Sequence, residues 1–264
     1  MKSKELKDKI LNSKIQTTET MLIEQKLNKL FDIDRENRED RVGMHGSGVI
    51  ASENDFCVRQ QVLSFYFRGR EVEIPPSLKR VFLQGWHIHE KWQKLFVQSG
   101  IARGVEQRGH SELWQLLFTP DAIIELDGKL YVVEIKSVNT FQYKSMKTHP
   151  SGEKQCRLYM HFTGIPRGFV LAEDKNTQEF KVIMVDYDPV KIKPYIQRMY
   201  DVLKAKDRFE KLGKLPKRNP QCTSESCKKA LGCPYSGCCF GSIRDPLDKE
   251  RYKKMRESWR LNND

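Results

Sequence analysis

The Asp127-Gly128 pair narrows the folds open to this chain more than any other feature, because it stands between two apolar runs that both read as strands. Asp-Gly is a strong signal for a two-residue β-hairpin turn, and such a turn fixes the register of its strands. With these two residues as the turn, Asp121 lies opposite Glu134. Opposite Cβ atoms are about 4.5 to 5.5 Å apart, so the two carboxylates repel each other.

A positive group is therefore expected between the two carboxylates. Lys136 shares the strand face of Glu134, whereas Ile135 points to the other face. A divalent ion bound by both carboxylates would also relieve the repulsion, and oxygen ligands suit Mg²⁺ or Mn²⁺. The alternative is an exposed hairpin with an incidental Glu–Lys pair. The flanking residues are too apolar for an exposed sheet.

Helix and strand signals on both sides of the hairpin predict an α/β fold with a central mixed β-sheet flanked by helices. Before it, the pattern predicts helices over 53–67, with Ser52 as N-cap, and over 77–96. After it come a helix from Ser151 to Gly164, strands within 167–174 and 179–188, and a helix over 189–213 opened by Asp188-Pro189.

The second predicted helix carries His89 at the helical spacing of three aromatic residues, Phe82, Trp86 and Phe96. This spacing places the histidine on the inward, apolar face. Taken alone, it indicates a core histidine.

The composition indicates an intracellular protein with a polyanionic partner. The net charge is +12 over 264 residues, which favours nucleic acid first and an anionic membrane surface second. No apolar run is long enough to span a membrane, and the lysine-rich start lacks a signal-peptide core, so we expect a cytoplasmic location. In a reducing compartment, five cysteines between positions 222 and 239 indicate metal or cluster ligands.

Four short motifs carry a family resemblance. Pro120-Asp121 and Glu134-Ile135-Lys136 resemble the signature of the PD-(D/E)xK nuclease superfamily. His89-Glu90 resembles the metal-binding histidine motif of RecB-type nucleases, and Gln155 with Tyr159 resembles their Q-x-x-x-Y motif. Over roughly residues 50 to 240 the chain is similar to stand-alone CRISPR-associated and phage RecB-like exonucleases.

The resemblance implies a restriction-endonuclease-like core and roles for the motif residues. One or two Mg²⁺ or Mn²⁺ ions would be held by His89, Asp121, Glu134 and the carbonyl of Ile135. Lys136 would orient or help to deprotonate the attacking water. Gln155 and Tyr159 would contact the strand or position the scissile phosphate.

The resemblance also implies a [4Fe-4S] cluster held by four cysteines. Cys233 and Cys239 reproduce the C-P-Y-x-x-x-C spacing, and Cys57 stands where the first ligand is expected. The usual C-x-x-C spacing falls on Ala230, so Cys227 is the first choice for the remaining ligand and Cys222 the reserve. A Cys₄ zinc site is the alternative. Cys156 is expected to be a small buried residue.

The predicted organisation is a charged helical arm over 1–45, a nuclease core over 46–215, and a cysteine cluster with a basic tail over 216–264, which packs with the helix of Cys57. The leading function is a metal-dependent DNA exonuclease acting on single strands or duplex ends, in phage recombination or replication or in CRISPR spacer acquisition. The alternative is a DNA-binding or assembly subunit with the same fold and cluster.

Two further functional classes receive little support. The chain has no P-loop, so unwinding or targeting would come from partners such as a helicase, a recombinase or a CRISPR integrase. A zinc-dependent hydrolase is the poorest interpretation, because the stretch from His87 to Glu90 lacks the second histidine that an H-E-x-x-H motif requires.

Overall fold

The computed structural model describes residues 20–23, 25–28, 43–69, 72, 74–243 and 246–261. The chain divides into two compact units, one formed by 1–39 with 73–83 and the other by 40–72 with 84–264. In the first unit the described residues are helical except for 74 and 75, and Arg80 Nη1 donates a hydrogen bond of 2.6 Å to Asn28 Oδ1. Most of the predicted arm over 1–45 lies outside the described residues.

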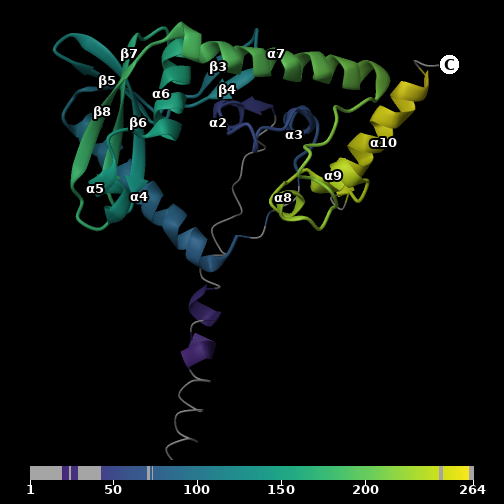
Figure 1. The fold of residues 1–264 in the computed structure, drawn as a ribbon, viewed down its shortest axis with the longest axis horizontal. Helices are drawn as coiled ribbons and strands as arrows, with labels where there is room; N and C mark the ends of the chain where they lie inside the picture. The colour runs from purple at the N-terminus through teal and green to yellow at the C-terminus, as the bar shows by residue number, and fades with distance from the viewer. Residues whose placement is uncertain are drawn as a thin grey trace, which may run out of the picture. The chain divides into compact units, whose positions relative to one another are not determined.

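The second unit is built around a five-stranded mixed sheet in the order β2-β5-β6-β7-β8 (Figure 1). Its strands are β2 (Ala102–Val105), β5 (Ala122–Leu126), β6 (Lys129–Val138), β7 (Arg167–Asp174) and β8 (Phe180–Asp186). β6 and β7 are parallel, whereas the other three neighbouring pairs are antiparallel. Helices α5 (Thr140–Ser145) and α6 (Pro150–Thr163) connect the parallel pair.

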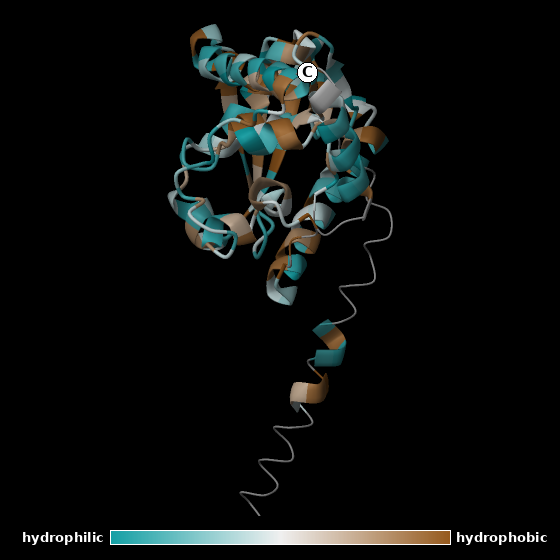
Figure 2. Ribbon diagram, turned by 90° about the vertical axis from the view of Figure 1, so that its right-hand side faces the viewer, coloured by the Kyte–Doolittle hydropathy of each residue, from teal (hydrophilic) through white to brown (hydrophobic). Residues whose placement is uncertain are grey.

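Helices cover both faces of this sheet. Successive side chains of β6 point to opposite faces and therefore belong to two different hydrophobic clusters. Val133 and Ile135 pack with Ile88 and Phe96 of α4 (Pro76–Gln98). Val132 belongs to the other cluster, which includes residues of α6 and of α7 (Pro189–Leu212). Figure 2 shows hydrophilic and hydrophobic stretches side by side on the surrounding helices, as amphipathic elements require. The predicted fold class is confirmed.

The hairpin has the predicted register. Ala122 pairs with Val133 and Leu126 with Lys129, so one further step of the same register brings Asp121 opposite Glu134. Both turn residues have positive φ, 48° at Asp127 and 70° at Gly128. Two successive positive φ angles are typical of a type I′ turn, whose twist matches that of the strands.

The sequence reasoning missed a second, three-stranded sheet, ordered β1-β4-β3. Its strands are β1 (Met44–His45), β4 (Leu116–Phe118) and β3 (Gly109–Ser111), and α2 (Gly46–Val49) follows β1. The first apolar run of the hairpin is therefore divided, since 116–118 belongs to this sheet and 122–126 to the main one.

Two predicted helix caps and one predicted buried aromatic residue were wrong. Ser52 closes a turn with Asp55 through bonds of 2.7 and 3.2 Å, and α3 (Val58–Leu63) begins only after Cys57, its N-cap. Trp86 is 55% exposed, because the buried stripe of α4 contains Ile88 instead. His149, not Ser151, caps α6 by accepting a hydrogen bond from Gly152 N at 3.1 Å.

The helix boundaries after the sheet follow the predicted caps. Asp188 accepts a hydrogen bond of 2.9 Å from Val190 N at the start of α7, and Gly213 ends that helix with φ 63°. α6 likewise ends at Gly164, with φ 70°. Left-handed φ angles at these two positions favour glycine.

The C-terminal region consists of α8 (Lys228–Leu231), α9 (Ser236–Phe240) and α10 (Pro246–Leu261). Buried Asp248 of α10 accepts hydrogen bonds from the backbone amides of Arg68 and Gly69 at 3.1 and 3.2 Å. Trp259 Nε1 donates to the Glu210 carbonyl of α7 at 3.0 Å. These bonds tie the end of the chain to the α3 region and to α7. None of the helices among the described residues is long and apolar enough to cross a membrane.

Candidate active site and cysteine cavity

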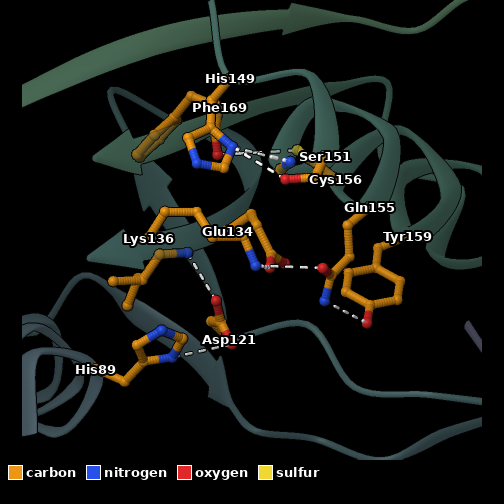
Figure 3. A network of polar contacts seen from close by, with 12 residues as sticks. His89, Asp121, Glu134, Lys136, His149, Ser151, Gln155, Cys156, Tyr159 and Phe169 are labelled. Carbon is orange, nitrogen blue, oxygen red and sulfur yellow. Dashed lines mark hydrogen bonds and ion pairs between the residues drawn. The ribbon is translucent and has the colours of Figure 1, made fainter. Parts of the chain in front are cut away.

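Asp121 lies at the start of β5 and is held from two directions (Figure 3). Its Oδ2 accepts a hydrogen bond of 2.6 Å from the backbone amide of Ile135. Its Oδ1 is 3.3 Å from Nδ1 of His89, which comes from α4. Asp121 therefore joins the catalytic-motif strand β6 to the histidine motif on the helix.

Glu134 is the most deeply buried charged group of the site, with 1% of its surface exposed. Its Oε1 accepts a hydrogen bond of 2.5 Å from Lys136 Nζ. Among the described residues, its Oε2 has no hydrogen-bond partner. Burial raises the pKa of Glu134 to about 8, the Asp121 carboxylate adds to the rise, and Lys136 opposes it. A buried oxygen without a partner is costly to the fold.

A chain of hydrogen bonds leads from the sheet to α6. Lys136 Nζ also donates to Gln155 Oε1 at 3.2 Å, and Gln155 Nε2 donates to the hydroxyl of Tyr159 at 3.0 Å. Gln155 and Tyr159 are one helical turn apart and project from the same side of α6. Burial, reinforced by the Glu134 charge, raises the pKa of Tyr159, so this hydroxyl keeps its proton.

The structure brings the predicted residues into two hydrogen-bonded groups that meet at consecutive residues of β6 and together form the polar network of Figure 3. One group is His89, Asp121 and the amide of Ile135, and the other is Glu134, Lys136, Gln155 and Tyr159. Cys156 points away from this network. Its buried Sγ lies 3.6 Å from the Val132 carbonyl, and burial raises the pKa of its thiol, as expected for a small core residue.

Two polar groups near the network were missed by the sequence reasoning. Burial lowers the pKa of His149, and the nearby charge of Lys136 lowers it further. Glu173 of β7 is buried and accepts bonds of 2.6 Å from both Lys91 Nζ and Trp92 Nε1 of α4. Glu173 holds the helix that carries His89 against the sheet. A charged residue inside an otherwise apolar strand was the available signal.

The donors of the site fit a hard divalent cation in kind. An imidazole and two carboxylates are suitable ligands, and the free Oε2 of Glu134 is an available oxygen. The 3.3 Å between His89 Nδ1 and Asp121 Oδ1 is near the roughly 3 Å that separates adjacent ligands of an octahedral ion with bonds of about 2.1 Å. Among the described residues no three His, Cys, Asp or Glu side chains are close enough together to hold a metal ion as they stand. Binding would therefore draw Glu134 toward the other pair.

The raised pKa of Glu134 predicts a pH-dependent stability change in the variant Glu134→Gln. Below pH 4.5 the carboxyl is protonated in both folded and unfolded chains, whereas toward pH 8 the unfolded chain alone gives up its proton. Wild-type stability therefore falls as the pH rises through this window. In EDTA, Glu134→Gln should stay close to the wild-type Tm near pH 5 and exceed it near pH 8 by roughly 10 °C.

Exposed Glu112, in the turn before β4, provides the matched control. Glu112→Gln should follow the wild-type Tm across the whole pH range, as judged by thermal unfolding. A Tm difference between Glu134→Gln and the wild type that does not change with pH would contradict the assigned shift.

A cavity of about 580 Å³ collects cysteines that are far apart in the sequence. The thiol-bearing residues that line it are Cys57, Cys222, Cys233 and Cys239. Burial raises the pKa of Cys233 to about 11, and neighbouring thiols add to the rise. Lys229 Nζ bonds to Asp55 Oδ1 at 2.7 Å, so ordinary polar contacts also hold the Cys57 segment beside the C-terminal region.

Cys227, the first choice from the sequence, is not among the residues that line this cavity, whereas Cys222, the reserve, is. Cys227 is the N-cap of α8, and its Sγ accepts a hydrogen bond of 3.4 Å from Ala230 N. Backbone amides, that of Ala230 first, lower the pKa of Cys227. Amide bonds to sulfur also occur at metal-bound thiolates, so Cys227 differs from Cys222 only in standing outside the lining of the cavity.

No protein-family model matches the sequence, and no curated protein matches it significantly. Among solved structures, the chain is similar to an alkaline exonuclease (LHK-Exo) from Laribacter hongkongensis, with a TM-score of 0.49 and 14% identity over 64% of this chain and 89% of that chain. For LHK-Exo in complex with dAMP the TM-score is 0.48 and the identity 16%, over 62% of this chain and 88% of that chain. For SSO0001 the TM-score is 0.43 and the identity 13%, over 85% of this chain and 98% of that chain. Similarity of this degree leaves the function to be inferred from the site itself.

Proposed function

We propose that this chain is a metal-dependent deoxyribonuclease, an exonuclease of the PD-(D/E)xK type acting on single strands or duplex ends. The observation that carries the proposal is Glu134, buried with an unpartnered Oε2 beside the Asp121 carboxylate. A buried carboxylate beside a second carboxylate destabilises a fold, and such groups are typical of catalytic and metal-binding sites.

Phosphodiester hydrolysis requires an activated water and a means to neutralise charge that develops on the phosphate. His89, Asp121 and Glu134 are the residues that would hold Mg²⁺ or Mn²⁺. Such an ion acts as a Lewis acid toward the phosphate and lowers the pKa of bound water. The backbone amide of Ile135 fixes Asp121 Oδ2 and leaves Oδ1 beside His89, so these two groups would bind the ion together.

Lys136 is suited to hold the attacking water or a phosphate oxygen. A lysine ammonium has three donor protons. Glu134 Oε1 and Gln155 Oε1 accept from this group, which leaves one proton for the substrate side. Because Gln155 Nε2 donates to Tyr159, the phenolic proton of Tyr159 is also available to an oxygen of the phosphate.

The charge of the chain supports DNA as the substrate. A net charge of +12 favours binding to a phosphate backbone without base readout. The alternative, a DNA-binding or assembly subunit, has no need for a repulsive carboxylate pair, so Asp121 and Glu134 favour the enzyme. A role in phage recombination or replication or in CRISPR spacer acquisition, beside a helicase, recombinase or integrase, is the biological context we propose.

We further propose that the cysteine cavity holds a [4Fe-4S] cluster on Cys57, Cys222, Cys233 and Cys239. Four thiols line one cavity, which supports this ligand set. Among the described residues no three of them are close enough together to hold a metal as they stand, so a cluster would draw these thiols together. The cluster would join the nuclease core, 46–215, to the C-terminal region, 216–264. The same four thiols could hold zinc, which is the competing cofactor.

The proposal is tested by digesting single-stranded and duplex DNA labelled at the 5′ or the 3′ end. Wild-type protein should release labelled mono- or oligonucleotides with Mg²⁺ or Mn²⁺ present, and EDTA should abolish the release. The labelled end that disappears first gives the polarity. Stable binding of the same DNA without any loss of label in either metal would favour the binding subunit over the enzyme.

A further inference from the structure

We propose that Phe141 is a stacking site for a nucleobase of the DNA strand that enters the catalytic site. The inference rests on the proposed nuclease function and adds a substrate contact to it. Phe141 is 84% exposed, more than any other large hydrophobic side chain among the described residues. It lies on α5, which begins two residues after the end of β6.

Hydrogen bonds fix the start of α5, so Phe141 is not exposed through a loose loop. Asn139 Oδ1 accepts from Gln142 N at 2.9 Å and caps the helix. Thr140 Oγ1 donates to Asp174 Oδ1 at 3.0 Å, and Asp174 is completely buried at the end of β7. The backbone on both sides of Phe141 is thereby tied to the sheet.

Tyr143 fixes the opposite side of the same helix. Its ring is buried and lies under Lys181 of β8, whose Nζ is 4.3 Å from the ring centroid. The same Nζ donates to the Tyr143 carbonyl at 2.6 Å. With Tyr143 turned to the sheet, α5 cannot rotate to bury Phe141. A rigid, exposed ring loses little conformational entropy when it stacks.

The surroundings of Phe141 favour a base on a polyanionic strand over an apolar protein partner. From Lys136 to Gly152 the chain contains no acidic residue, and Lys144 and Lys147 are exposed. The other exposed side chains of α5 are polar or basic, so among the described residues of this helix Phe141 is a single exposed apolar ring. Nonspecific binding of single strands combines these two features, positive charge along the backbone and an aromatic face for the bases.

The chain connection places this ring within reach of the reacting phosphate. Phe141 is five positions after Lys136, which limits the distance between their Cα atoms to about 18 Å. With bases roughly 3.4 Å apart along a stacked strand, the ring meets a base within about five steps of the scissile bond. Such a contact requires an unpaired base, so it favours single strands and frayed ends over intact duplex.

The test measures strand binding apart from cleavage, in the Lys136→Ala background and with a single-stranded oligonucleotide that contains 2-aminopurine. Phe141→Ala should raise the Kd roughly 5- to 150-fold, the range for losing one aromatic–base stack. It should also remove the fluorescence quenching at one position of the probe. Phe141→Trp should keep both binding and quenching.

Leu113→Ala is the matched control, since Leu113 is also an apolar side chain that is 77% exposed. This variant should leave the Kd unchanged. An abasic site at the quenched position should weaken binding by the Lys136→Ala protein but not by the double variant with Phe141→Ala. Equal losses in both would overturn the inference.

The outcome separates this inference from the nuclease proposal. If wild-type protein digests DNA but Phe141→Ala binds the probe with unchanged affinity and quenching, the stacking site is wrong and the nuclease proposal stands. If wild-type protein neither binds nor digests DNA, the proposed function fails and the inference fails with it.

Discussion

Replacing Lys136 with alanine is expected to slow metal-dependent DNA digestion at least about 100-fold, the usual cost of losing one group that stabilises transition-state charge. The ammonium is held by Glu134 Oε1 and Gln155 Oε1 at 2.5 and 3.2 Å, so its remaining proton has a defined direction. Single-turnover digestion of end-labelled DNA, with protein in excess over DNA, measures this effect on the chemical step.

The control for charge is Lys129→Ala. Lys129 begins the same strand β6 but is exposed beside the hairpin turn, so its loss should leave the single-turnover rate within about twofold, as for surface changes far from a site. Lys136→Met retains the aliphatic length of the side chain and should be as inactive as Lys136→Ala. Full activity in either Lys136 variant would contradict the catalytic role.

Folding of the Lys136 variants needs its own measurement. The Lys136 ammonium lowers the pKa of buried Glu134, so its loss also changes the charge balance of the sheet. Without it, Glu134 is expected to keep a proton more strongly rather than to unfold the sheet. The far-UV circular dichroism of Lys136→Ala should therefore match the wild type. If activity is lost while the spectrum stays native, the loss comes from the chemical step and not from unfolding.

The geometry of the hairpin could be predicted from the sequence because its determinants are local. Asp127-Gly128 selects the turn, the turn sets the register, and the register places Asp121 opposite Glu134. The caps of α7 at Asp188 and Gly213 are local in the same sense. Where a few neighbouring residues decide the backbone, pattern and structure agree.

The features that escaped prediction depend on contacts between distant segments. β1 is two residues long and pairs with β4 some seventy positions later, so neither strand has a periodic signal of its own. Ser52 matched an N-cap pattern, yet its hydroxyl bonds to Asp55 in a turn instead. A serine side chain can serve either structure, and only the packing of the residues after it decides between them.

Replacing Cys222 with alanine is expected to remove the bound iron and sulfide, whereas Cys227→Ala should retain them. Cys222 lines the cavity with Cys57, Cys233 and Cys239, and Cys227 does not. The sequence favoured Cys227 by its distance from Cys233 along the chain, but Cys227 caps α8 and stands outside the lining of the cavity. Iron and acid-labile sulfide content of anaerobically purified variants measures the difference, together with absorption near about 400 nm from thiolate-ligated iron.

Cys222→Ala should also destabilise the protein more than Cys227→Ala does. The cavity joins Cys57 to residues more than 160 positions later, so a cluster there closes a long loop. Loss of a cross-link of this kind costs about 2 to 5 kcal/mol. At about 2 to 4 °C per kcal/mol, Cys222→Ala should lower the Tm by roughly 5 to 20 °C. Cys227→Ala removes only a cap, which costs about 1 kcal/mol, or a few degrees.

Cys238→Ala is the second control, because Cys238 is adjacent to Cys239 and yet absent from the lining of the 580 Å³ cavity. It should keep full iron and sulfide content. If Cys227→Ala loses the metal and Cys222→Ala keeps it, the ligand set is wrong. A colourless wild type with one zinc per chain, lost in Cys222→Ala, would retain the four ligands and replace the cluster by a Cys₄ zinc site, since four thiolates satisfy tetrahedral zinc as readily as a cubane.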